Sequence, residues 1–138
     1  GLLMSGDRNA SDALQEFAKY GVKIAMDDFG TGYSSLSYLR QYPFHLLKID
    51  RCFVDGIGTS SADRALINAS ITMAHGLKLK VVAEGIETEE QLAFLEGLSC
   101  DYAQGYLFGK PLSEDDFCEL LEPSKSSNKR PYLKAIRK

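Results

Sequence analysis

The sequence predicts an α/β fold in which parallel strands are joined by helices. Apolar segments of strand length alternate with segments of helical periodicity four times along the 138 residues. Such alternation is typical of parallel sheets whose strands are connected by crossover helices. Hydrophobic residues make up 44% of the chain and charged residues 25%, which is the composition of an ordinary globular domain.

The amino-terminal elements follow from periodicity and from glycine and proline positions. A helix is expected over residues 10–20, with Gly21 as its stop. A strand over residues 22–26 comes next and runs into a pair of aspartates. A glycine loop at residues 30–32 and a short helix closed by Pro43 complete the first unit.

The later elements repeat this order. Strands are expected at residues 46–49, at 79–83 and, more weakly, at 100–102. The helices are expected over 62–75 with Gly76 as a left-handed cap, after a capping box at Thr88–Gln91, and from Ser113 onward. We therefore predict one domain over residues 1–122 and a basic tail or linker over 123–138. Four such strands alone would leave two open sheet edges.

Charge is distributed unevenly along the chain. Nineteen acidic and ten basic residues up to position 122 give the body a charge of −9, and six basic residues after it give the tail +6. An acidic body does not attract nucleic-acid polymers, and an anionic substrate would need cations beside it. No apolar run is long enough to span a membrane, so we expect no membrane contact from this segment. Three widely spaced cysteines favour a reducing, cytoplasmic location, although a longer parent could be membrane-tethered.

Polar side chains gather where the predicted strands end. In parallel α/β folds the functional residues lie on the loops after the carboxyl ends of strands. The residues at these ends are Asp27, Asp28, Lys48, Asp50, Glu84, Glu87 and Gln104. Because the strand interiors are apolar, this distribution predicts one site at one edge of the sheet.

Carboxylates brought together at that edge favour a hard cation. Two like charges about 4 Å apart cost roughly 4 kcal/mol at an effective dielectric near 20. Oxygen ligands without a His or Cys cluster favour Mg²⁺, Mn²⁺ or Ca²⁺ over zinc. The alternative is that Asp28 only caps the following turn and Asp27 is an ordinary strand-end residue. Lys48 either orients a water or phosphate or forms a structural ion pair, and Glu84 is either a general base or a ligand.

Four ordered motifs together closely resemble the EAL domain family, the phosphodiesterases that open the bacterial second messenger cyclic di-GMP to linear pGpG. The motifs are DDFGTGYSSL at 27–36, LKIDR at 47–51, VAEGIE at 82–87, and QGY at 104–106 running to Lys110–Pro111. The resemblance extends over roughly residues 10 to 121. Its specificity comes from the combination of four motifs in order.

The resemblance implies a modified TIM barrel that binds two Mg²⁺ or Mn²⁺ ions and hydrolyses cyclic di-GMP with a metal-activated water. By matching positions, Asp27 and Asp28 resemble metal ligands and Lys48 the residue that holds the attacking water. Glu84 resembles the proposed general base or a partner of the metal site. Glu87 resembles a stabiliser of the loop after the first strand, and Gln104 a polar member of the site.

The match covers only part of such a domain. A full barrel takes about 250 residues, so these βα units correspond to about half of one, its carboxyl-terminal half. The Glu-Ala-Leu triplet and the family's preceding Asn and Glu ligands are absent from the sequence. We therefore expect the chain alone to be inactive, and to form a homodimer through the barrel or to pair with the missing amino-terminal half. A non-catalytic EAL-like module that binds cyclic di-GMP or a protein partner is the alternative.

Overall fold

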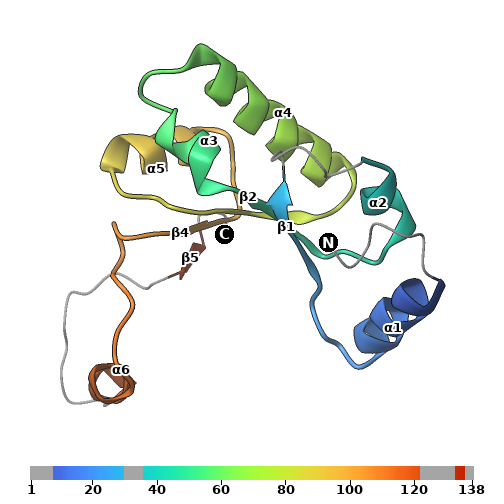
Figure 1. Cartoon of the computed structure of the whole chain (residues 1–138). Helices are drawn as coiled ribbons and strands as arrows, with labels where there is room; N and C mark the ends of the chain where they lie inside the picture. Colours follow the sequence, from blue (N-terminus) through green and yellow to red (C-terminus); the bar gives the residue numbers. More distant parts are fainter. Residues whose placement is uncertain (1–7, 30–35, 122–132, 136–138) are drawn as a thin grey trace.

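A five-stranded sheet forms the centre of the computed structural model, which describes residues 8–29, 36–121 and 133–135 (Figure 1). The strands are β1 (Ala25–Phe29), β2 (Leu46–Ile49), β3 (Lys80–Ala83), β4 (Tyr102–Gln104) and β5 (Leu133–Ala135). They lie in the order β1-β2-β3-β4-β5. The first four are parallel, as predicted, and β5 is antiparallel to β4.

Helices follow each of the four parallel strands. The helices are α1 (Arg8–Lys19), α2 (Leu36–Gln41), α3 (Arg51–Asp55), α4 (Ser61–Gly76), α5 (Glu89–Gly97) and α6 (Glu114–Leu121). Helices α3, α4 and α5 lie on the same face of the sheet (Figure 1). The sequence predicted all of these helices except α3, which is only five residues long. No helix in the described part of the chain is long and apolar enough to cross a membrane.

The hydrophobic core lies between the sheet and the helices on that face. Alternate strand residues point into it, because successive side chains of a strand face opposite sides. The strand and helix residues that are most completely buried there are Leu47, Ile49, Val81, Ala83, Ala103, Val54, Ile67, Ile71 and Leu95. One face of the sheet therefore holds the core.

The opposite face of the sheet carries polar side chains beside the apolar or aromatic ones of Leu46, Val82 and Tyr102. Lys48 is half-buried there, and Lys80 and Gln104 are exposed. In a TIM barrel, helices cover the outside of the strands and the other face lines the interior. A parallel sheet with one face covered by helices is the arrangement expected for about half of such a barrel.

Backbone geometry corrects several details of the prediction. The first strand begins three residues later than expected and includes both aspartates, because β1 pairs with β2 from Ala25 to Phe29. Gly21 has a positive φ of 80° after α1, as its position suggested. Gly76 instead remains within α4, and the left-handed residue is Lys78, with φ 62°.

Strand β5 was not predicted. It lies within the basic segment that the sequence analysis assigned to a tail, and it covers the edge of β4 that a four-stranded sheet would have left open. Within the described residues, β1 pairs only with β2, so one open edge remains of the two that were expected. The glycine loop at residues 30–32 and most of the tail lie outside the described residues.

Two helix starts match their predicted caps. The Thr88 side chain accepts a hydrogen bond from the backbone N–H of Gln91, and the Gln91 side chain accepts one in return from the backbone N–H of Thr88. This reciprocal capping box satisfies two donors that the first turn of α5 would leave unpaired. The Ser113 hydroxyl likewise accepts from the backbone N–H of Asp116 at the start of α6.

We expect Gly105→Ala to destabilise the fold by about 1–3 kcal/mol, because an added methyl group must displace packed backbone. The backbone of Ile86 lies against Gly105, so a Cβ there would overlap its nitrogen and carbonyl oxygen. Gly76→Ala is the matched control, since its Cβ would meet no atom and alanine favours a helix by up to about 1 kcal/mol. Denaturant unfolding of both variants measures the difference. Equal stability of the two variants would contradict the packing argument.

Candidate functional site

Three charged side chains meet where β1, β2 and β3 end. Because the strands are parallel, their carboxyl ends lie at the same edge of the sheet. The backbone N–H of Glu84 donates to the carbonyl of Ile49 at 3.1 Å, which continues the pairing one residue beyond β3. The predicted site residues Asp27, Lys48 and Glu84 are brought together here.

Lys48 forms ion pairs with both neighbouring carboxylates. Its Nζ lies 3.0 Å from Asp27 Oδ1 and 2.8 Å from Glu84 Oε1. The Lys48 side chain is 26% exposed and that of Glu84 24%, whereas Asp27 is 58% exposed. One ammonium thus lies between carboxylates from two different strands and compensates their repulsion.

The same contacts control the protonation of Lys48. Burial by itself would lower the pKa of Lys48, but hydrogen bonds to Glu84 and Asp27 and the attraction of both carboxylates raise that pKa above its usual value. Lys48 therefore carries its positive charge throughout the neutral pH range.

The backbone turns at the second aspartate. Asp28 has a φ of 52°, and the β1–β2 register shifts between Met26 and Phe29, so the strand pairing is irregular at this point. The Asp28 backbone N–H also donates to Asp27 Oδ1 at 3.0 Å. The turn occurs at Asp28 itself.

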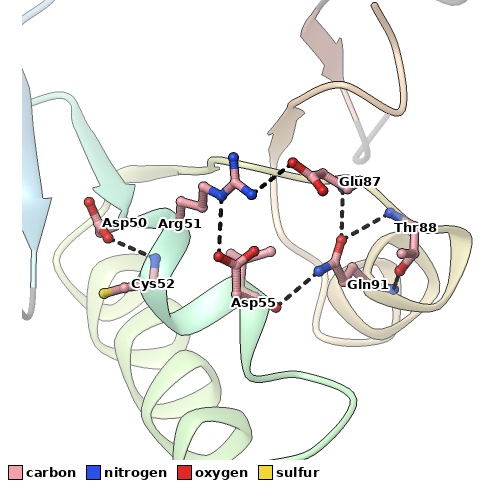
Figure 2. Close-up of polar contacts among 8 residues, drawn as sticks. Asp50, Arg51, Cys52, Asp55, Glu87, Thr88 and Gln91 are labelled. Carbon is pink, nitrogen blue, oxygen red and sulfur yellow. Dashed lines mark hydrogen bonds and ion pairs between the residues drawn. The ribbon is translucent and has the colours of Figure 1, made fainter.

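The loop after β3 is held by Arg51, a residue to which the sequence analysis gave no role. Arg51 Nη2 lies 2.8 Å from Glu87 Oε1, and its Nε donates to Asp55 Oδ2 at 3.2 Å (Figure 2). Gln91 Oε1 accepts from the backbone N–H of Glu87 at 2.8 Å, and Gln91 Nε2 donates to the carbonyl of Val54 at 3.3 Å. Glu87 therefore contacts α3 and α5 and does not join the Lys48 cluster.

Two glycines let the chain pass close to these groups. Gly85 has a φ of 74°, and a side chain there would overlap the Arg51 side chain. Gly105 lies against Ile86, whose N–H donates to the Gln104 carbonyl at 3.0 Å. Gly105 thus lets the QGY motif contact the VAEGIE motif, and Gly85 lets the VAEGIE motif contact Arg51 of the LKIDR motif.

An open pocket lies beside the charged cluster. It has a volume of about 280 Å³ and is lined by Arg51, Glu84, Glu87, Gln104 and Tyr106, together with the two glycines. Gln104, a predicted site residue, thus lines the same pocket as Glu84. Arg51 and Tyr106 are members of this pocket that the sequence analysis quoted in motifs without giving them a role.

Asp50 has a structural role among the strand-end residues. Its side chain accepts from the backbone N–H of Cys52 at 2.8 Å and caps α3 (Figure 2). Hydrogen bonding from the Cys52 side chain, and then from its backbone N–H, lowers the pKa of Asp50, so the cap is ionised at neutral pH.

The donor set fits part of a divalent metal site. Asp27 and Asp28 supply adjacent carboxylates, and oxygen ligands of this kind suit Mg²⁺ or Mn²⁺. The ammonium of Lys48 lies between Asp27 and Glu84, so these two carboxylates already share one cation. In the described part of the chain, no group of three or more metal-ligating side chains is present. An ion held by Asp27 and Asp28 would take its remaining ligands from water or from other residues.

Comparison with known proteins agrees with the motif analysis. The model of the EAL domain family matches residues 3–111. The cyclic di-GMP phosphodiesterase NbdA of Pseudomonas aeruginosa is 52% identical over 99 residues, which cover 72% of this chain and 13% of that protein. The chain thus spans only a small part of this curated relative.

Two solved structures that contain cyclic di-GMP are also similar to this chain in sequence and fold. The PaMucR phosphodiesterase in complex with c-di-GMP is 42% identical with a TM-score of 0.76, and the match covers 83% of this chain and 46% of that one. A manganese and cyclic di-GMP complex of Klebsiella pneumoniae BlrP1 is 33% identical with a TM-score of 0.71, covering 80% of this chain and 28% of that one.

Proposed function

Because this chain belongs to the EAL domain family, we propose that it forms the carboxyl-terminal part of a metal-dependent phosphodiesterase that hydrolyses cyclic di-GMP to linear pGpG. The observation that carries the proposal is Lys48, held between Asp27 and Glu84 at the shared edge of three strands. A relative named as a cyclic di-GMP phosphodiesterase and a related structure in complex with c-di-GMP support this substrate.

In the proposed mechanism, Asp27 and Asp28 would hold divalent cations together with ligands outside the described residues. When bound, two Mg²⁺ or Mn²⁺ ions would neutralise the charge of the substrate's phosphates and allow water to ionise at neutral pH. A related structure with manganese and cyclic di-GMP supports divalent dependence. The exposed Asp27 carboxylate and the turn at Asp28 are consistent with this role.

Lys48 and Glu84 are proposed to act on the attacking water. The Lys48 ammonium donates hydrogen bonds, so it can hold the water oxygen in line with the scissile P–O bond. Glu84 lies 2.8 Å from that ammonium and can accept the water's proton. The water oxygen then bonds to phosphorus, one ester P–O bond breaks, and the leaving oxygen takes up a proton.

The remaining polar residues are proposed to shape the substrate side of the site. Glu87 fixes Arg51 beside the pocket through their 2.8 Å ion pair. Gln104 lines the same pocket and can contact the nucleotide. We propose that the open edge of β1 pairs with the amino-terminal half of the domain, or that the sheet face opposite the helices contacts a second copy in a homodimer.

The direct test is hydrolysis of cyclic di-GMP by the full-length protein that contains this chain. With Mg²⁺ or Mn²⁺ we expect linear pGpG as the product, measured by liquid chromatography, and its loss in Asp27→Asn. We expect residues 1–138 alone to release no pGpG, because the preceding Asn and Glu that the family resemblance implies as ligands are absent from the sequence. Binding of cyclic di-GMP without hydrolysis by the full-length protein would support the non-catalytic alternative, and activity of the isolated chain would overturn the expected requirement for further ligands.

A further inference from the structure

A second pocket lies at the opposite end of the strands from the Lys48 cluster. It is lined by the first residues of β2, β3 and β4, among them Lys80 and Tyr102, and by residues of the loops that precede the strands. Its volume is about 300 Å³, at the lower end of the range for small-molecule sites. The proposed mechanism uses none of its residues.

The lining of this amino-terminal pocket is basic. Lys23, Lys78 and Lys80 contribute three positive charges, and no carboxylate is among the lining residues. Lys80 is paired with Asp101 at 2.7 Å. Within the described residues, Lys23 and Lys78 have no ion pair. Two ammonium groups therefore remain for an anion in a chain whose body is otherwise acidic.

A hydrogen-bonded backbone frame positions these residues. The N–H of Lys78 donates to the carbonyl of His75 at 3.0 Å, and φ at Lys78 is 62° in the turn between α4 and β3. The N–H of Lys80 donates to the carbonyl of His45 at 2.9 Å. Lys78 and Lys80 thus occupy hydrogen-bonded backbone positions, which reduces the ordering cost of binding.

The pocket also has an aromatic wall and a histidine. Phe44 and Tyr102 both line it. His45 Nδ1 accepts from the backbone N–H of Ile24 at 3.3 Å, so in the neutral ring Nε2 carries the proton and is a hydrogen-bond donor. Cationic donors beside aromatic rings suit a ligand with a phosphate group and an apolar portion.

We propose that the amino-terminal pocket binds a small organic phosphate, with its phosphate group at Lys23 and Lys78 and its apolar portion against Phe44 and Tyr102. This site lies apart from the proposed phosphodiesterase centre and does not depend on that function.

The proposal is tested by titrating ¹⁵N-labelled residues 1–138 in metal-free buffer with phenyl phosphate and, separately, with inorganic phosphate at matched ionic strength. We expect saturable amide shifts near Lys23, His45, Lys78 and Tyr102, with tighter binding of phenyl phosphate. The double variant Lys23→Ala/Lys78→Ala should weaken binding about tenfold, because each removes one exposed ionic contact.

The matched control is Lys19→Ala/Arg40→Ala, which removes the same charge from two exposed positions outside the pocket. This control should leave the affinity within about twofold, since such distant exposed charges are screened by salt. Equal weakening by both double variants would mean non-specific attraction and would overturn the proposal. So would shifts confined to the Lys48 edge, or no saturation with either probe. Circular dichroism confirms that each variant is folded.

Discussion

Replacing Lys48 with alanine is expected to lower cyclic di-GMP hydrolysis by the full-length protein by about 10²–10³-fold, the effect typical of removing one preorganised electrostatic group. Lys48 is the only side chain in the described residues that forms ion pairs with both Asp27 and Glu84. Without it, the two carboxylates lose the cation between them and the proposed water loses its donor. The loss should appear in kcat more than in KM, because the proposed contact acts on the attacking water.

A matched variant and a folding check make this prediction specific. Lys19→Ala removes a lysine whose ion pair with Glu16, at 3.2 Å, lies on the surface of α1, and it should leave the rate unchanged. Circular dichroism and thermal unfolding should show that Lys48→Ala still folds, since its partners retain contact with solvent. Because the pKa of Lys48 is raised, the wild-type rate should show no loss of activity from Lys48 deprotonation between about pH 6 and 9. A near wild-type rate for Lys48→Ala would remove this residue from the mechanism.

The sequence was sufficient to locate the convergence of charged residues at the strand ends. Once strands are parallel, their carboxyl ends share one edge, so Asp27, Lys48 and Glu84 had to lie near one another. The individual contacts were not predictable in the same way. Whether Lys48 pairs with one carboxylate or two depends on the register of three strands, and the sequence analysis left its ion-pair and functional interpretations open.

Where the prediction failed, long-range pairing outweighed local preference. Aspartate is uncommon in strands, so the first strand was ended before Asp27, yet pairing with β2 extends β1 to Phe29. Strand β5 has only three residues, and its partner β4 lies about thirty positions earlier. Arg51 contacts Glu87 from another βα unit. Such contacts leave no periodic signal in the local sequence.

Asp101→Asn is expected to destabilise the chain by about 3 kcal/mol, because a buried carboxylate with charged partners contributes more than an exposed ion pair. Asp101 is only 2% exposed. It accepts hydrogen bonds from Lys80 Nζ at 2.7 Å, from His75 Nε2 at 2.9 Å and from the backbone N–H of Val81 at 3.0 Å. The amide nitrogen of an asparagine carries hydrogens and cannot accept a hydrogen bond. At least one of the three donors would therefore lose its acceptor.

The pH dependence of the same variant tests the electrostatic origin of the effect. Burial by itself would raise the pKa of Asp101, but hydrogen bonds from Lys80, His75 and Val81 outweigh it and lower that pKa below its ordinary value. A lowered folded-state pKa gives stability that is fully present above the unfolded pKa and is lost as the pH falls through the folded pKa. The stability gap between wild type and Asp101→Asn should therefore be full above about pH 4 and shrink below it.

Urea unfolding of residues 1–138 at pH 7 and at several pH values below 4 measures this gap. The control for the loss of one negative charge is Asp12→Asn, at an exposed position of α1. The control should change stability by less than about 0.5 kcal/mol. A gap that stays constant on acidification would mean that Asp101 contributes through packing alone. A stability gap that shrinks as expected instead requires an ionised carboxylate at Asp101. That carboxylate joins β3, through Lys80 and Val81, to His75 of α4, at the end of the sheet opposite the Lys48 cluster.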